Sequence, residues 1–554
     1  MRFVRRLYVP ILVFLIATQT VAQVPGAASL PNAPPALDQQ QPLELKQLSP
    51  SSTTSSDAKQ VGKTYRIRRF DFTGVTLVPE IELQQAVQPY QDHELSADQL
   101  QFAATAVVKA YVIKGWLARV GIIPTADGYA EVKVQELRFG QMRVDAPTGN
   151  RASPALAETY IGNRQTSGAP LSVADVERGT TLLNATPGIA AATALDPGQT
   201  PDKVDLVVRL RDRPMLSGQV FTDNHGLREI GQARVGADLQ FSNGLGFGDQ
   251  ANLTFRASQF SNLKRGSFSL PVGNDGLRAG ISAYHFEYRA GRVGASLGLQ
   301  GTIANWRGFI AKPLLIQTNH TLLGSLAYEE SRLRDDSDFG ELDKRQVSRW
   351  RISLNDNTSD ARTLTHIAIQ VTTGKADLSE NAGDLAADAA STRTHGHFAL
   401  VGWHLGREQR LDGGDILVTK LNGQMASRNL ESSHKFSLGG PNGVRAYPVA
   451  EALGDEGWLA SIERRTALAD SAQAGLFLDT GHIRINHRAW GNGRNHYSLA
   501  GLGASIRWLL PDSYHLKAEA AHQIGLNPNR NASNNDSDGR TNRWRFWLSL
   551  AKSF

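Results

Sequence analysis

The chain has 554 residues, too many for one ordinary domain, so several domains or one very large β structure are expected. Its 41% hydrophobic and 20% charged residues indicate neither a disordered chain nor a helical membrane protein. The net charge of +6 is spread along the chain without a dense Lys/Arg block, so no nucleic-acid partner is indicated. The chain has no cysteine, which excludes thiol catalysis, cysteine metal sites and disulfides.

The first residues resemble an export signal. Three arginines within the first six residues precede an apolar run over residues 7–17, and Ala22 is the small residue that a signal peptidase prefers. The run is too short for a membrane anchor, which needs roughly 20 apolar residues. We therefore expect a cleaved signal peptide at 1–22. Residues 23–63 are rich in Pro, Gln, Ser and Thr and predict a linker.

Two small α/β units are predicted next, over residues 64–137 and 138–213. In the first, Ser96 and Gln99 form a capping box at the head of a helix, and the expected order is strand, helix, helix, strand, strand. The same order recurs in the second, where Ser172 begins a helix. Two copies of one unit indicate a tandem array, and an exposed sheet edge in each could accept a strand from a partner.

From residue 214 to the end, predicted helices stop and runs of alternating residues follow. The connectors alternate in length: those at 274–276 and 510–513 are tight, and those at 334–344, 376–392, 428–456, 482–496 and 525–541 are long. Short turns on one side and long loops on the other are typical of an outer-membrane barrel, here with about sixteen strands.

The last run carries the clearest alternation. One face holds Trp544, Phe546, Leu548, Leu550 and Phe554, while the other holds Arg545, Ser549, Ala551 and Ser553. A soluble β-sandwich also alternates, but it would not usually bury charges repeatedly on one face. The fold class is therefore mainly β, a sixteen-stranded transmembrane barrel preceded by two α/β domains.

The stretch 436–447 places Arg445 among glycines and a proline, between long alternating strands. In a second stretch, 476–481, alternation turns Phe477 and Asp479 away from the two neighbouring leucines. An Arg in a loop and an Asp on the inner face of a strand predict a loop folded inward and held by a charged hydrogen bond. The alternative is an ordinary ion pair in a water-filled lumen, where charge costs little.

These features resemble one family, the two-partner secretion transporters, which export large hemolysins and filamentous adhesins across the bacterial outer membrane. The resemblance covers nearly everything after the linker. Its motifs are Gly74, Lys114-Gly115-Trp116, Pro187-Gly188, Asp223-Asn224-His225-Gly226, Gly248-Asp249, Phe436-Ser437-Leu438-Gly439-Gly440, Val444-Arg445-Ala446-Tyr447, and Phe477 with Asp479 and Gly481.

The resemblance implies roles for these residues. Both α/β units would be POTRA domains. An inward-loop motif would comprise Gly439, Gly440, Val444, Arg445, Ala446 and Tyr447, and an anchoring strand motif Phe477, Asp479 and Gly481. Trp544, Phe546, Leu548, Leu550 and Phe554 would form a C-terminal assembly signal. The family usually carries Gly in place of Ala446, and a Cβ there restricts the backbone if the position needs a positive φ.

The resemblance also implies function and place. The POTRA domains would capture an unfolded exoprotein in the periplasm, and the chain would pass through the barrel without ATP. Further partners would be outer-membrane lipid, lipopolysaccharide and the barrel assembly machinery. Residues 23–50 would hold the family's plug helix. No cofactor or metal is expected.

Other functions stay open at this point. A barrel-assembly factor of the same superfamily would usually carry more POTRA units, and a diffusion porin would explain neither the α/β units nor the inward loop. An enzyme is the weakest hypothesis, because no nucleophile, base or metal set is visible.

Overall fold

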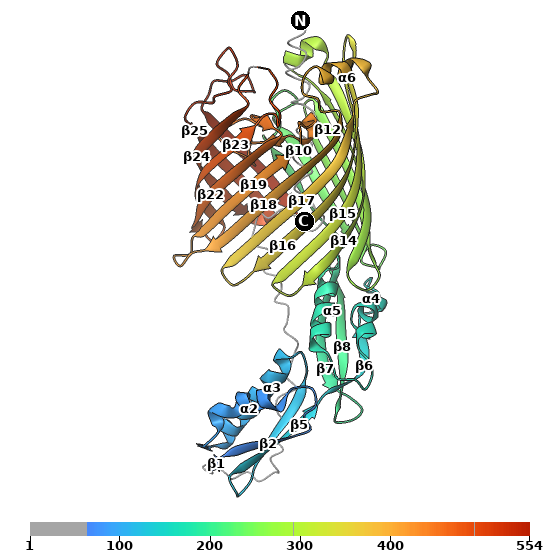
Figure 1. The fold of residues 1–554 in the computed structure, drawn as a ribbon, viewed down its shortest axis with the longest axis vertical. Coiled ribbons are helices and arrows are strands. Elements are labelled where there is room, and N and C mark those ends of the chain that lie inside the picture. Colours follow the sequence, from blue (N-terminus) through green and yellow to red (C-terminus); the bar gives the residue numbers. More distant parts are fainter. Residues whose placement is uncertain (1–63, 292, 492) are drawn as a thin grey trace. The chain divides into compact units, whose positions relative to one another are not determined.

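The computed structural model describes residues 64–291, 293–491 and 493–554. The expected signal peptide, linker and plug helix lie outside these residues. The described chain falls into two compact units. One comprises Pro214–Gly244 and Asp249–Phe554, and the other comprises the described residues up to Arg213 together with Leu245–Gly248 (Figure 1). No helix among the described residues is long and apolar enough to cross a membrane.

The first α/β module follows the predicted order, except that its first strand is divided into two and a short strand lies between the helices. Its elements are β1 (Tyr65–Ile67), β2 (Arg69–Thr73), α2 (Glu80–Val87), η2 (Gln88–Tyr90), β3 (His93–Leu95), α3 (Ala97–Ile113), β4 (Ala118–Pro124) and β5 (Tyr129–Glu136). A sheet of order β2-β5-β4 carries the helices, and β2 runs parallel to β5. The predicted capping box is present, because the Ser96 and Gln99 side chains each bond the other's backbone N–H.

The second module repeats this arrangement. Its elements are β6 (Arg138–Asp145), α4 (Pro154–Tyr160), η3 (Gly162–Arg164), α5 (Val173–Ala185), β7 (Ile189–Pro197) and β8 (Lys203–Asp212). The sheet order is β6-β8-β7, again with one parallel and one antiparallel pair. In both modules an edge strand, β2 or β6, runs parallel to the central strand.

Glu136, at the end of β5, ties the first module together. Its carboxylate accepts hydrogen bonds from the Thr76 and Leu77 backbone N–H groups, both at 2.7 Å, and from the Tyr111 hydroxyl at 2.9 Å. Burial raises the pKa of this carboxyl, but the hydrogen bonds from Thr76, Leu77 and Tyr111 outweigh it and leave the pKa below its usual value.

We predict that Glu136→Ala destabilises the first module by about 1–2 kcal/mol, because four donors, including the Thr76 hydroxyl, lose their acceptor. In the unchanged protein the stabilisation by the Glu136 carboxylate is fully present at pH values above the ordinary glutamate pKa. It is lost as the pH falls through the lowered pKa of Glu136. Hydrogen exchange of residues 65–136, measured by mass spectrometry from pH 7 down to pH 3, checks both expectations. Equal protection in the variant and the unchanged protein would contradict them.

Within the described residues, sixteen antiparallel strands close into one barrel, which confirms the predicted fold (Figure 1). They are β9 (Leu216–Asp223), β10 (Arg234–Ser242), β11 (Gln250–Ser258), β12 (Ser261–Val272), β13 (Leu277–Arg289), β14 (Gln300–Ile316), β15 (His320–Ser337), β16 (Gly340–Ser359), β17 (Thr363–Asp377), β18 (Gly396–Arg410), β19 (Ile416–Ala426), β22 (Glu456–Ala469), β23 (Ala472–Arg484), β24 (His496–Leu510), β25 (Tyr514–Ile524) and β26 (Trp544–Ser553). The last strand pairs with the first, from Ser549 opposite Asp223 onwards.

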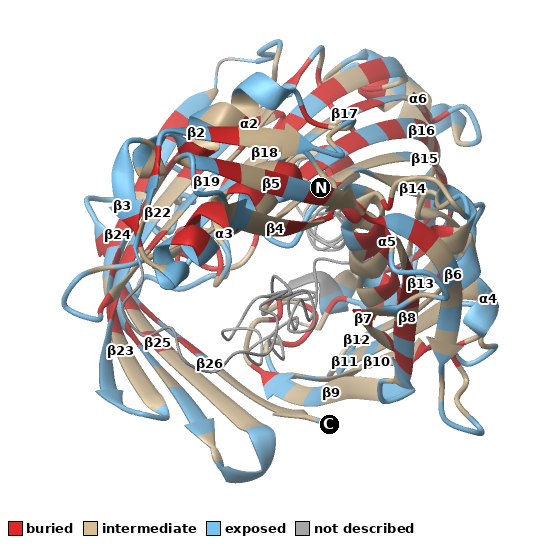
Figure 2. Cartoon of the chain, turned by 90° about the horizontal axis from the view of Figure 1, so that it is seen from below, coloured by how far each residue is buried: buried red, intermediate tan, exposed pale blue. Residues whose placement is uncertain are grey.

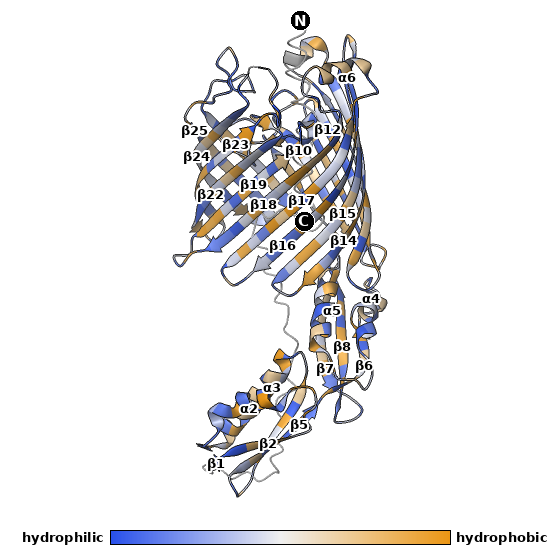
Figure 3. Ribbon diagram, viewed as in Figure 1, coloured by the Kyte–Doolittle hydropathy of each residue, from blue (hydrophilic) through white to orange (hydrophobic). Residues whose placement is uncertain are grey.

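Residues along the barrel strands point alternately to the outer and the inner face, as predicted. On β23, Leu476 is 72% exposed on the outer face, whereas Phe477 is 5% exposed and Asp479 is fully buried. Figure 2 shows buried and exposed residues alternating along β14 and β16, and Figure 3 shows apolar residues recurring along the barrel strands. Apolar residues outside and polar residues inside are what a lipid-embedded barrel requires.

Two expectations for the connectors are wrong. Residues 334–344 are not a long loop, because β15 and β16 extend through them and leave only residues 338 and 339 between the strands. Their outward side chains are charged rather than apolar, so the apolar alternation that predicts a barrel strand is absent from this part of the sequence. Helices also do not stop at residue 214, since α6 (Ala382–Ala389) forms after β17 behind an Asn381 cap. Single-turn helices lie at η4 (Val293–Leu297) and η6 (Pro511–Ser513).

Candidate functional site

The segment between β19 and β22, residues 427–455, folds into the barrel, and we call it the inward loop. It contains η5 (Ser432–His434) and two short strands that pair with each other, β20 (Phe436–Ser437) and β21 (Leu453–Gly454). Its residues Leu438, Val444, Ala446 and Tyr447 are fully buried. They form one apolar cluster with inward-facing wall residues, which are Leu459, Phe477, Ile483, Tyr497, Leu499 and Ala521.

Arg445 lies at the centre of this contact. Its Nε and Nη2 donate to the two carboxylate oxygens of Asp479 at 2.8 and 2.9 Å, and its backbone N–H donates to the same side chain at 3.1 Å. Its Nη1 donates to Glu463 at 3.0 Å and to Glu519 at 2.9 Å. The predicted pairing of Arg445 with Asp479 is therefore present. It is bidentate, which is the strongest geometry for an arginine–carboxylate pair.

Three strands position the carboxylates. Asp479 comes from β23, Glu463 from β22 and Glu519 from β25, each at an inward position of the alternation. Other positive side chains also neutralise these carboxylates. Arg465 and Arg507 form ion pairs with Glu463, and Lys517 lies 2.9 Å from Glu519. The Arg445 guanidinium carbon also lies 3.2 Å from the centre of the Phe477 ring, a cation–π contact.

Glycines shape the tip of the loop. Gly440 has a φ of +107°, which only glycine adopts easily. A Cβ on Gly443 would lie 1.9 Å from the Leu438 carbonyl oxygen, and one on Gly481 would lie 2.6 Å from the Leu438 side chain. The loop backbone thus approaches itself closely at Gly443, and at Gly481 the Leu438 side chain packs against the wall where a Cβ would stand.

Ala446, the departure from the family pattern, needs no positive φ in this structure. Its side chain is fully buried against β24, where the opposing residue is Gly501. A Cβ on Gly501 would lie 2.4 Å from the Ala446 Cβ. The wall therefore has a glycine where the loop carries a methyl group.

Trp547 on β26 is a site residue that was not predicted from the sequence. Its indole Nε1–H donates to the Arg445 carbonyl oxygen at 2.8 Å, and the side chain is buried. The strand alternation offered a signal, because residue 547 has the same parity as the inward-facing Arg545. The closing strand of the barrel therefore also contacts the loop tip.

We predict that Trp547→Phe weakens the docking of the inward loop by about 1–2 kcal/mol, because the buried Arg445 carbonyl loses its donor. Hydrogen exchange over residues 436–447 should quicken, with the barrel strands unaffected. Trp544→Phe on the outer face of the same strand is the control and should change nothing. Unchanged exchange in Trp547→Phe would show that this hydrogen bond does not hold the loop.

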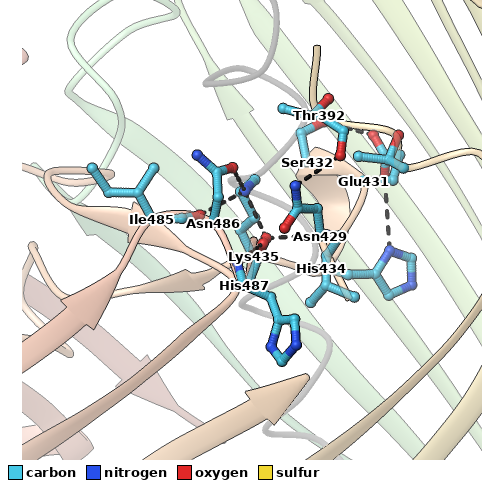
Figure 4. A network of polar contacts seen from close by, with 12 residues as sticks. Thr392, Asn429, Glu431, Ser432, His434, Lys435, Ile485, Asn486 and His487 are labelled. Atoms are coloured by element: carbon cyan, nitrogen blue, oxygen red, sulfur yellow. Dashed lines mark hydrogen bonds and ion pairs between the residues drawn. The ribbon is translucent and has the colours of Figure 1, made fainter. Parts of the chain in front are cut away.

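The base of the loop is held by contacts within the loop and with neighbouring loops (Figure 4). Lys435 Nζ donates to Asp455 at 2.6 Å and to the Ile485 carbonyl oxygen at 2.9 Å. Asn429 Nδ2 donates to the Thr392 carbonyl oxygen at 2.7 Å. Burial lowers the pKa of the nearby His434 to about 4, so this imidazole is neutral at pH 7.

A third contact joins the inward loop, beyond its tip, to the connector between β25 and β26. Glu451 accepts from the Asn527 amide at 2.8 Å and from the Ser537 backbone N–H at 2.7 Å. Burial raises the pKa of the Glu451 carboxyl. Asp536 in the same connector is bound by Arg530 and Arg545. The connector between β25 and β26 thus packs onto the inward loop, which is held at its base, its centre and its far side.

The residues expected to form the C-terminal assembly signal lie as the alternation predicts. Trp544, Phe546, Leu548 and Phe554 are exposed, and Leu550 is half-buried. The Phe554 N–H donates to the Gly218 carbonyl oxygen at 3.0 Å across the barrel closure. Their role in assembly stays a prediction.

Two family models match the chain. The one described as haemolysin secretion/activation protein ShlB/FhaC/HecB matches residues 202–508, and that of the ShlB-type POTRA domain matches residues 65–136. The heme/hemopexin transporter protein HuxB of Haemophilus influenzae (strain 86-028NP) is 24% identical over 490 residues, which cover 85% of this chain and 84% of HuxB.

Solved structures share the fold. CdiB from Escherichia coli has a TM-score of 0.65 at 16% identity, over 91% of this chain and 93% of CdiB. CdiB from Acinetobacter baumannii has a TM-score of 0.62 at 14% identity, over 92% and 95% of the two chains. BamA from Haemophilus ducreyi lacking POTRA domains 1–3 has a TM-score of 0.56 at 15% identity, over 89% and 100%. At such identities these structures support the fold alone.

Proposed function

Because the chain belongs to the ShlB/FhaC/HecB family of haemolysin secretion/activation proteins, we propose that it exports one large exoprotein as an unfolded chain and without ATP. The protein is a two-partner secretion transporter, an outer-membrane barrel with POTRA domains in the periplasm. HuxB is named for heme/hemopexin transport. An exoprotein connected with heme or hemopexin is therefore one specific candidate cargo for this chain.

Capture by the POTRA domains would use their sheet edges. Within the described residues, each three-stranded sheet has two outer strands, β2 and β4 in one module and β6 and β7 in the other. An extended segment of cargo can add to such an edge through main-chain hydrogen bonds, with little demand on its sequence. This mode suits a cargo that arrives unfolded. The boundaries 64–137 and 138–213 remain our proposal for the two domains.

The inward loop would hold the barrel in its transport-competent state. The observation that carries this proposal is the Arg445 contact, in which one buried guanidinium joins carboxylates from three strands. The glycine run 439–443 lacks the Lys-Ser/Thr ending of a phosphate-binding loop. It packs against the loop's own backbone instead, so it supports a structural role and no nucleotide site.

The barrel would also meet lipid and its assembly machinery. Its exposed apolar face suits outer-membrane lipid and lipopolysaccharide. The exposed aromatic residues of β26, with Phe554 at the end, would serve as the signal that the barrel assembly machinery reads during insertion.

Deleting the encoding gene tests the export function. We expect one very large protein to disappear from the culture medium, with the other outer-membrane proteins at normal levels, and the gene supplied in trans should restore it. A loss of many outer-membrane proteins together would instead indicate an assembly factor. An unchanged medium would contradict the proposal.

A further inference from the structure

A cluster of four arginines lies on the inner wall away from the Arg445 contact. Arg265 comes from β12, Arg307 from β14, and Arg349 and Arg351 from β16. We call these four residues the lumenal arginine cluster. Arg307, Glu329 and Arg349 stand in one row across adjacent strands, and Arg351 is two residues further along β16.

One carboxylate, that of Glu329, forms ion pairs with three of the four arginines. Glu329 on β15 lies 2.8 Å from Arg349 Nε, 3.0 Å from Arg351 Nη1 and 3.6 Å from Arg307 Nε. Arg265 makes no hydrogen bond or ion pair among the described residues, and the carboxylates that act on it electrostatically are Glu329 and Asp238. On its other side Arg349 contacts His434 of the inward loop, whose imidazole is neutral. With Asp238 on β10 counted, the four arginines carry two positive charges more than the two carboxylates Glu329 and Asp238 balance.

The positive surplus is buried. Arg307, Arg349 and Arg351 are each less than 10% exposed, and the Nε–H groups of Arg307 and Arg351 have no hydrogen-bond acceptor among the described residues. A buried cation without its counter-charge is costly. Around Arg445, in contrast, four cations face three carboxylates. The two sides of the lumen thus differ in charge balance.

We infer that the lumenal arginine cluster binds anionic groups in the pore. A guanidinium presents paired N–H donors that match carboxylate and other oxyanion geometry. The source is either the carboxylate side chains of the chain in transit or free inorganic anions. The first source rests on the proposed export function, whereas the second does not.

Ion selectivity in planar lipid bilayers tests the cluster itself. In a KCl gradient the reversal potential should show that the pore prefers Cl⁻ to K⁺. In Arg265→Gln/Arg307→Gln the Cl⁻/K⁺ permeability ratio should fall roughly twofold or more. Arg265→Gln alone breaks no described ion pair, so it should change selectivity with the barrel intact, as shown by heat-dependent gel mobility. A pore that prefers K⁺, carries no current, or keeps its ratio in both variants would overturn the inference.

The matched control is Arg332→Gln. Its side chain is 74% exposed on the outer face of β15, so selectivity should not change. The source is distinguished by adding polyglutamate or polylysine of equal length to the bilayer. We expect polyglutamate to block the current, and to block it less in Arg265→Gln/Arg307→Gln. Altered selectivity without polyglutamate block would overturn the carboxylate source and leave inorganic anions as the ligand. No readout here needs exported cargo, so failure of the export function would not be mistaken for failure of this inference.

Discussion

Replacing Arg445 with alanine is expected to abolish export of the exoprotein while the barrel stays folded and inserted. The substitution removes one cation from a site in which Asp479, Glu463 and Glu519 are all buried. Breaking a buried ion pair by removing one partner costs about 3–5 kcal/mol. Because the strands keep their own hydrogen bonds, we expect that cost to fall on the docked loop, which should leave the wall.

Two further variants sharpen this test. Arg445→Lys keeps the charge but cannot donate from a planar fork to Asp479 and to a second carboxylate at once, so export should also fail. Arg464→Ala removes an arginine from the outer face of β22, where it pairs with Asp415, and export should stay normal. Full export by the Arg445→Ala protein would end the proposed role of the loop contact.

The second large effect is expected at Gly501. In Gly501→Ala the new methyl group would lie 2.4 Å from the Ala446 Cβ. Overpacking a buried contact of this kind costs about 1–3 kcal/mol. The β24 backbone is fixed by hydrogen bonds to both neighbouring strands, so the loop tip should move instead. We expect most export to be lost, measured as exoprotein in the medium.

The same contact offers a rescue. Ala446→Gly removes the opposing methyl group, so the double variant Ala446→Gly/Gly501→Ala should recover export. Gly308→Ala is the control, because a Cβ at this position of β14 meets no atom within 4 Å. Failure of the double variant to recover, with its barrel intact, would show that the Ala446–Gly501 contact is not what limits the Gly501→Ala protein.

Much of the fold could be predicted, because strand alternation records which face each residue occupies. Leu476 and Phe477 lie on opposite faces as expected, and the sixteen-strand barrel follows from repeating that pattern. The failures occurred where the outward residues are charged. Residues 334–344 continue two strands, yet they lack the apolar residues that would have marked them.

The site could be predicted only in part. The Arg445–Asp479 pair followed from two short motifs, but Glu519 and Trp547 lie 74 and 102 residues from Arg445. Which inward residue meets the loop tip depends on the tilt and stagger of the strands, and alternation does not specify these. Parity places both side chains inside the barrel. It does not say that they meet one guanidinium.

Protection of the loop tip from a thiol reagent tests the central claim most directly, since the chain has no cysteine of its own. Val444 is fully buried beside Arg445. In the purified full chain, Val444→Cys should resist a polar maleimide, whereas Ser533→Cys in an exposed connector should react at once. Adding Arg445→Ala to the Val444→Cys protein should make its thiol react as fast as that of the Ser533→Cys protein. Rapid labelling of the Val444→Cys protein with Arg445 present, or lasting protection without it, would contradict a loop held in place by this guanidinium.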